Sequence, residues 1–211
     1  MKKMILLTTA TMFAVAAGLQ AQTTATSNPI RFGLRAGVNL SNMVKSSDND
    51  ITTGSKTGFN AGAFLEIPVA SIFSVQPEIQ FSQKGYKESG TALGTPYEYK
   101  RTTNFIEVPL LAKISPVPGF GIVVGPQFSF LASTKTQFTV ANATRETIVK
   151  EDSDNLRKNV LGGVIGIEAG VKNFVASLRY NMDFQNNNGD GTSTTPTYKN
   201  QVISLGLGIR F

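Results

Sequence analysis

Apolar and polar residues alternate with a period of two along eight stretches of this chain. In the last stretch the apolar face carries Ile203, Leu205, Leu207, Ile209 and Phe211. The opposite face carries Val202, Ser204, Gly206, Gly208 and Arg210. Successive side chains of a strand point to opposite faces, so this pattern predicts strands with one apolar face and one small or polar face. The predicted strands span residues 31–40, 57–67, 73–85, 104–114, 119–131, 159–171, 174–184 and 200–211.

The connections between these strands alternate between long and short. The long ones are predicted as loops at residues 41–56, 86–103, 132–158 and 185–199. The short ones are turns at 68–72, 115–118 and 172–173, the last with the length and residue types of a two-residue hairpin turn. Up-and-down strands with this alternation place all long loops at one end of the sheet. Outer-membrane barrels have that asymmetry, with short periplasmic turns and longer loops outside.

The residue types on the two faces indicate which face is inside. The polar face is rich in glycine, for example at Gly33, Gly37, Gly125, Gly166 and Gly208. Glycine weakens a water-facing strand, whereas inside a narrow eight-stranded cylinder it leaves room for a neighbouring Arg or Glu. The apolar face keeps aromatic residues near strand ends, where they would form partial girdles at membrane interfaces. The pattern therefore predicts an all-β protein, an eight-stranded antiparallel up-and-down transmembrane β-barrel.

The first residues have the organisation of a signal for export. Lys2 and Lys3 precede an apolar run at residues 4–19, and Leu19-Gln20-Ala21 is a suitable cleavage site. We therefore expect a cleaved signal peptide at 1–21, a flexible periplasmic lead-in at 22–30 and the barrel at 31–211. The expected location is the outer membrane. The chain has no Cys, so a lipoprotein anchor is excluded.

Composition narrows the possible chemistry. The chain of 211 residues suits one domain and contains neither Cys nor His. This excludes disulfides, thiolate metal sites, most zinc sites and His-dependent catalytic triads. The formal charge of +6 becomes +4 without Lys2 and Lys3 (18 basic minus 14 acidic residues), and no dense basic cluster suggests nucleic-acid binding. We expect no enzymatic activity, no cofactor and no nucleic-acid partner.

Five segments carry a resemblance to a known family. They are residues 33–39, 76–85 and 105–113, together with Gly125-Pro126 and Arg179-Tyr180-Asn181. Together they resemble the signature strands of PorT-like outer-membrane barrel proteins of Bacteroidetes, over residues 31–211. The resemblance implies the fold and the membrane. Since the name-giving member is associated with the type IX secretion pathway, it also implies an accessory role in secretion as one alternative.

Ten charged residues fall on the face predicted to line the lumen. The cations are Arg35, Lys84, Lys113, Arg179 and Arg210, and the anions are Glu66, Glu78, Glu107, Glu168 and Asp183. One hypothesis is a paired-carboxylate site with Glu78 and Glu107 as acid and base. We favour the other, a salt-bridged plug, because an unpaired charge in a narrow lumen costs several kcal/mol and no nucleophile accompanies the carboxylates.

The strand register predicts which of these charges meet. With Val171 opposite Phe174, Glu168 lies opposite Ser177 and diagonal to Arg179. Arg35 and Glu66 are expected on adjacent strands at similar depth. Lys113 and Arg210 are expected near the periplasmic rim.

Two acidic clusters in the long loops could supply oxygen ligands to Ca²⁺. They are Asp48-Asn49-Asp50 and Glu151-Asp152-Ser153-Asp154. Neither has the spacing of an EF-hand loop, so both are predicted to be solvated loop charge rather than metal sites.

These patterns favour a structural or interaction protein, an adhesin or envelope accessory that acts through its external loops. A narrow passive pore and an accessory of protein secretion are the alternatives. Expected partners are outer-membrane lipid, an unidentified extracellular or periplasmic protein, and the barrel-assembly machinery. The last would recognise the C-terminal strand through Ile209 and Phe211.

Overall fold

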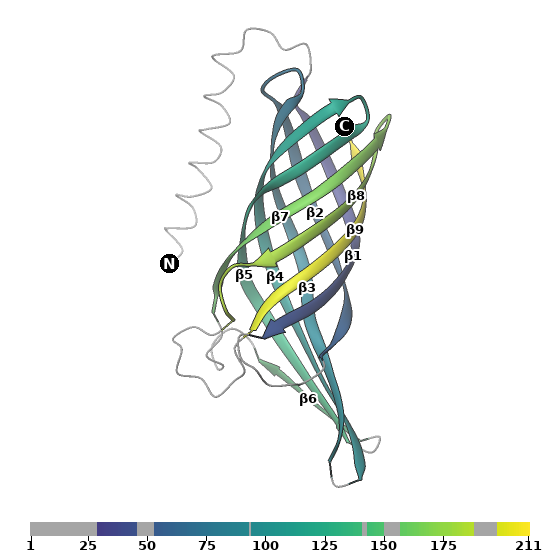
Figure 1. The fold of residues 1–211 in the computed structure, drawn as a ribbon, viewed down its shortest axis with the longest axis vertical. Helices are drawn as coiled ribbons and strands as arrows, with labels where there is room; N and C mark the ends of the chain where they lie inside the picture. The colour runs from purple at the N-terminus through teal and green to yellow at the C-terminus, as the bar shows by residue number, and fades with distance from the viewer. Residues whose placement is uncertain (1–28, 46–52, 93, 141–142, 150–156, 188–197) are drawn as a thin grey trace.

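The computed structural model of the protein describes residues 29–45, 53–92, 94–140, 143–149, 157–187 and 198–211 (Figure 1). Nine strands make up this part of the chain. They are β1 (Arg31–Lys45), β2 (Thr53–Pro68), β3 (Phe73–Ala92), β4 (Thr95–Val117), β5 (Phe120–Val140), β6 (Ala143–Val149), β7 (Asn159–Val171), β8 (Phe174–Asp183) and β9 (Tyr198–Arg210). Among these residues no helix is long and apolar enough to cross a membrane. The expected signal peptide at 1–21 and most of the lead-in at 22–30 lie outside the described residues.

Eight of the strands close into a ring. Their order is β1-β2-β3-β4-β5-β7-β8-β9, and β9 pairs back onto β1. Every pairing is antiparallel, and the strands are tilted relative to the long axis (Figure 1). The ninth strand, β6, pairs only with the far part of β5 and lies outside the ring. The predicted eight-stranded antiparallel barrel is confirmed.

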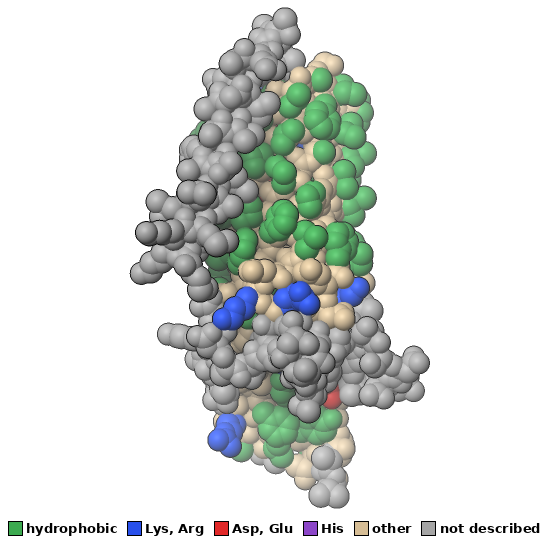
Figure 2. All heavy atoms as spheres, turned by 90° about the vertical axis from the view of Figure 1, so that its left-hand side faces the viewer, with side chains coloured by type: hydrophobic (Ala, Val, Ile, Leu, Met, Phe, Trp, Pro, Cys, Tyr) green, Lys and Arg blue, Asp and Glu red, His purple; other side chains and the backbone are tan. Residues whose placement is uncertain are grey.

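The barrel is apolar outside and polar inside, the reverse of a water-soluble protein. Leu207 is 71% exposed and Phe174 is 68% exposed, whereas Lys84 and Glu107 are each 1% exposed. Hydrophobic side chains cover the outer wall, with Lys and Arg at its lower edge in Figure 2. Exposing so much apolar area to water would be strongly unfavourable, so this wall is built to face lipid.

The apolar wall ends at a row of outward polar side chains. Gln83 donates from its side chain to Asn104 at 3.1 Å, and Asn104 donates to Ser133 at 2.9 Å. On β3 and β4, Gln83 and Asn104 pair with each other one outward position beyond the outward apolar pair Phe81 and Ile106. The row therefore marks the edge of the membrane-spanning part.

The three short connections lie together at one end, which we call the turn end. Lys172 has a φ of 53°, and Val171 pairs with Phe174, so residues 172–173 form the predicted two-residue turn. Gly119 takes a φ of 80° in the turn between β4 and β5, a conformation that glycine adopts without strain. The opposite end, where the described strands reach the long connections, is called the loop end.

The strands continue past their predicted bounds at the loop end, so two predicted loops are wrong. Residues 86–103 are not a loop but a continuation of the β3–β4 hairpin, paired up to Ala92 opposite Thr95. Residues 132–158 likewise contain the end of β5 and all of β6. Beyond the membrane the outward face of a strand meets water and no longer needs apolar residues, so the contrast between an apolar and a polar face that marks a strand is lost. We call residues 86–101, 134–140 and 143–149 the sheet extension (Figure 1).

Candidate functional site in the barrel lumen

The ten predicted lumen charges lie on the inward face in two groups. The turn-end group contains Arg35, Glu66, Glu78, Lys113, Glu168, Arg179 and Arg210. The loop-end group contains Lys84, Glu107 and Asp183. All of these side chains are at most 12% exposed. Strand alternation, not local sequence, brings them together from seven different strands.

Glu78 is the centre of the turn-end group. Arg179 donates to both of its oxygens, at 2.8 and 2.9 Å, in the two-pronged geometry that suits a guanidinium and a carboxylate. Arg35 adds an ion pair at 2.6 Å, and the side-chain amide of Gln76 donates at 2.8 Å. Gln76 itself is fully buried. Glu78 is thus surrounded by donors and shielded from water.

Glu168 links this centre to the turn end. Arg179 binds it at 2.6 Å and Lys113 at 3.1 Å. The predicted register holds, because Glu168 pairs with Ser177 across β7 and β8. Lys113 then reaches Glu66 at 3.0 Å.

One predicted proximity is wrong. Arg35 does not meet Glu66, because the β1–β2 register places Gly62 opposite Arg35 and Arg31 opposite Glu66. The two charges therefore differ in depth by four residues. Arg35 binds deeper carboxylates, and Glu66 instead accepts ion pairs from Lys113 and from Arg210, the latter at 3.2 Å.

The loop-end group is separate and smaller. Lys84 lies between Glu107 at 2.7 Å and Asp183 at 3.2 Å. Glu107 also accepts from Gln80 at 2.8 Å, and Asp183 accepts from Asn200 at 2.6 Å. Each carboxylate here is satisfied by a cation and by a side-chain amide.

A layer of neutral polar side chains fills the lumen between the two groups. Asn39 lies at its centre and donates to Ser82 at 3.1 Å. The side-chain oxygen of Asn39 accepts hydrogen bonds from the Asn60 amide at 2.6 Å and from the Ser204 hydroxyl at 2.8 Å. Asn181 in turn donates to Ser204 at 3.0 Å. This layer joins side chains of β1, β2, β3, β8 and β9, and we call it the Asn39 layer.

The proposed acid–base pair is not assembled as such. Glu78 belongs to the turn-end group and Glu107 to the loop-end group, and their side chains are 1% and 2% exposed. Both carboxylates are bound to cations and amides. A carboxylate so placed has neither a free oxygen nor access to a substrate, so the arrangement favours ion pairing over proton transfer.

Glycine residues leave space for the long cationic side chains, and aromatic rings pack against two of them. A Cβ on Gly166 would lie 2.7 Å from Cγ of Arg179, and a Cβ on Gly121 would lie 2.8 Å from Cε of Lys113. The guanidinium of Arg35 lies 5.1 Å from the centre of the Phe64 ring. Lys84 lies at the same distance from Phe105, so both cations gain a cation–π contact.

An aromatic cluster that the sequence reasoning missed caps the lumen at the loop end. Tyr86 packs against Tyr198 at 5.3 Å and Tyr99 at 6.0 Å between ring centres, with Met43 beside them. These residues lie beyond the apolar wall, and burial raises the pKa of the Tyr86 and Tyr198 hydroxyls. The signal was the alternation at Tyr97, Tyr99 and Arg101, which continues that of β4.

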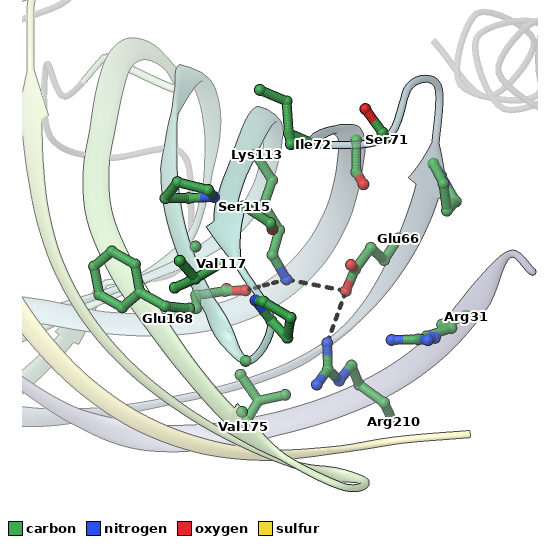
Figure 3. A pocket seen from close by; sticks show the side chains of 18 of the residues that line it. Arg31, Glu66, Ser71, Ile72, Lys113, Ser115, Val117, Glu168, Val175 and Arg210 are labelled. Atoms are coloured by element: carbon green, nitrogen blue, oxygen red, sulfur yellow. Dashed lines mark hydrogen bonds and ion pairs between the residues drawn. The ribbon is translucent and has the colours of Figure 1, made fainter. Parts of the chain in front are cut away.

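A cavity of about 410 Å³ opens at the turn end of the barrel (Figure 3). Glu66, Lys113, Glu168 and Arg210 line its inner side, joined by the ion pairs drawn in Figure 3. Arg31 also lines it, and the sequence reasoning gave that residue no role. The cavity places the predicted rim residues Lys113 and Arg210 next to solvent.

The predicted assembly signal lies on the outer wall. Ile209 faces outward, opposite Leu34 on β1 and Phe174 on β8. Phe211 is 66% exposed and stacks on Phe32, with ring centres 6.3 Å apart. Its backbone N–H donates to the Phe32 carbonyl at 2.7 Å, which extends the seam between the first and last strands.

The two acidic clusters weighed as calcium sites, residues 48–50 and 151–154, lie outside the described residues. Within the described ranges, no group of three or more acidic side chains is arranged to hold a metal ion.

Comparison with known proteins gives a family and a set of similar folds. A family model described as an outer membrane protein beta-barrel domain matches residues 20–189. Among curated protein sequences none matches the chain.

Several solved structures are similar in fold. The attachment invasion locus protein Ail of Yersinia pestis is 14% identical, with a TM-score of 0.45, over 86% of this chain and 98% of Ail. Neisserial surface protein A is 13% identical, with a TM-score of 0.48, over 85% of this chain and 97% of its own. The outer membrane enzyme PagL is 10% identical, with a TM-score of 0.35, over 84% and 98%. These likenesses carry no functional argument.

Proposed function

The chain belongs to the outer membrane protein β-barrel family and lies in the outer membrane, and on this premise we propose that it is a non-enzymatic interaction protein. In this proposal the salt-bridged lumen is a structural plug. The sheet extension at the loop end stands outside the cell and binds a partner there. The single observation that carries the proposal is the contrast between a filled lumen and a long, water-exposed sheet.

The plug argues against transport as the main role. An eight-stranded barrel has an interior just wide enough for side chains to fill. Here two charged groups and the Asn39 layer occupy it in succession. Gln76 and Gln127 are fully buried within the same lumen. A solute crossing the barrel would have to break several ion pairs at once.

The sheet extension supplies the binding surface. On β3, Ala92 lies eleven residues beyond Phe81, the last outward apolar residue before the polar row. At ~3.4 Å per residue this is about 37 Å along the strand, far more than is needed to clear the lipid headgroups. Among the described residues β6 pairs on one side only, with β5, so within this part of the chain its other edge is an unpaired sheet edge at which a partner strand could add.

The orientation follows from the two ends. The loop end carries the extension and the long connections, and outer-membrane barrels direct long connections outward. We therefore place the turn end in the periplasm. The narrower assignment to the PorT-like group and the role of Ile209 and Phe211 in recognition by the assembly machinery stay predictions.

The proposal is tested by shortening the extension. Replacing residues 88–99 with Asn-Gly joins Lys87 to Lys100, which pair across the hairpin, by a two-residue turn. The cells are compared for attachment to each other and to protein-coated surfaces. We expect attachment to fall to the level of cells without the protein, while the amount in the outer membrane stays unchanged.

A matched control exchanges a residue at the other end, Ser71→Ala, on the exposed β2–β3 turn. It should leave attachment unchanged. Attachment that survives the shortening at equal protein level would contradict a binding role for the β3–β4 hairpin.

A further inference from the structure

The charges of the lumen are balanced overall but not locally. Four cations face three anions in the turn-end group, and one cation faces two anions in the loop-end group. The ten charges therefore cancel. Arg31, at the turn-end cavity, adds a sixth cation that this balance does not include.

Arg31 has no hydrogen-bond or ion-pair partner among the described residues, although its backbone pairs with Glu66 on β2. Its neighbour Arg210 is incompletely satisfied. One of its terminal nitrogens binds Glu66 at 3.2 Å, and its Nε is buried with no hydrogen-bond partner in the described structure. Figure 3 shows Arg31 and Arg210 beside Glu66 at the same mouth. Two guanidinium groups at one cavity thus keep free donors.

The rest of the cavity wall is largely apolar. Ile72, Val117, Phe120 and Val175 line it opposite the charges. Its volume of about 410 Å³ lies in the range of sites that hold small molecules.

From this geometry we infer that the turn-end cavity binds a carboxylate carried on a short apolar body. The carboxylate meets the guanidinium groups of Arg31 and Arg210, which form the charge-assisted bonds that such a group accepts best. The apolar body packs on the opposite wall. A small free carboxylate and the C-terminal carboxylate of a peptide present the same chemistry to this cavity.

The site lies at the end opposite to the proposed partner surface, so its test is independent of that function. The mature protein, labelled with ¹⁵N-arginine and held in detergent micelles, is titrated with hexanoate and with trialanine. Hexanamide and carboxyl-amidated trialanine serve as neutral probes. The Nε–H signals of Arg31 and Arg210 should shift saturably, at millimolar concentration, with the carboxylates and not with the amides.

Two variants at the same rim make the test specific. Arg31→Gln should weaken binding about tenfold, as expected for the loss of one charged hydrogen-bond partner. Lys172→Asn removes an equal charge from a neighbouring turn that does not line the cavity, and it should bind as the unmodified protein does. Both should keep the heat-dependent gel migration of a folded barrel.

Binding of hexanoate alone would identify a small carboxylate as the ligand source, and binding of trialanine alone would identify a peptide terminus. Either result supports the inference. Three results would overturn it. The neutral amides could bind as well as the carboxylates, or neither carboxylate could bind saturably. Arg31→Gln and Lys172→Asn could also weaken binding equally.

Discussion

Removing Arg179 should destabilise the barrel more than any exposed substitution. Arg179 makes three hydrogen bonds to buried carboxylates, two to Glu78 at 2.8 and 2.9 Å and one to Glu168 at 2.6 Å. Arg179→Met breaks all three and leaves both anions buried. Breaking a buried pair in this way costs about 3–5 kcal/mol of unfolding free energy. Arg35 still binds both carboxylates, so we expect the lower part of that range.

The reasoning is tested by a double-mutant cycle with Glu168→Gln. That change strands positive charge on Arg179, Arg35 and Lys113, so alone it should also cost several kcal/mol. The double variant removes one charge of each sign. It should cost less than the sum of the singles by about 1–3 kcal/mol. Arg179→Lys keeps the charge but loses the two-pronged geometry, and it should fall between the unmodified protein and Arg179→Met.

Unfolding by urea from lipid vesicles, followed by far-UV circular dichroism, measures these differences. Arg145→Met, an exposed position on β6, is the matched control and should change the free energy by less than about 0.5 kcal/mol. Two results would refute the view that the lumen charges hold the barrel together. The single variants could lower the free energy of unfolding no more than this control does, or the effects of the two single changes could add strictly in the double variant.

Three further predictions concern packing, assembly and orientation. Gly166→Ala places a Cβ 2.6 Å from the Leu178 carbonyl oxygen and should lower the free energy of unfolding by about 1–3 kcal/mol in the same urea assay. Gly54→Ala is the control, because no atom lies nearer than 3.8 Å to the added Cβ, and it should be neutral. Deleting Phe211 removes its contacts with Phe32 and should reduce the folded fraction in outer-membrane extracts; an unchanged fraction would exclude an assembly role. In intact cells a membrane-impermeant maleimide should label Thr91→Cys and not Ser71→Cys, since the chain has no other Cys; the reverse pattern would invert the orientation.

The membrane-spanning part could be predicted from sequence because the membrane imposes a strict pattern there. Every second residue from Ile203 to Phe211 faces lipid and is apolar, so alternation marks both the strand and its outward face. The sheet extension could not be predicted in this way. Tyr97 and Thr102 have high strand propensity, but the outward face of the extension meets water, so the apolar face that marks the membrane-spanning strands is missing there.

The candidate site was predictable in its residues but only partly in its contacts. Alternation places all ten charges on the inward face. The partner of Glu168 followed from a two-residue turn, which fixes the register of β7 and β8. The β1–β2 connection is long and fixes no register. The prediction that Glu66 and Arg35 lie at similar depth was therefore wrong. Arg31 lay on the correct face, but its place in the wall of the turn-end cavity is visible only in the three-dimensional structure.

The central claim is that the lumen is closed by its own side chains. A conductance measurement tests this claim most directly. The purified protein is inserted into planar bilayers, with an open porin prepared in the same way as the positive control. The two charged groups and the Asn39 layer between them place ion-paired and hydrogen-bonded side chains across a lumen that is only wide enough for side chains to fill, so we expect no large steady conductance at neutral pH. A large, steady conductance from the unmodified protein would contradict the plug and make the narrow pore the better account of its function.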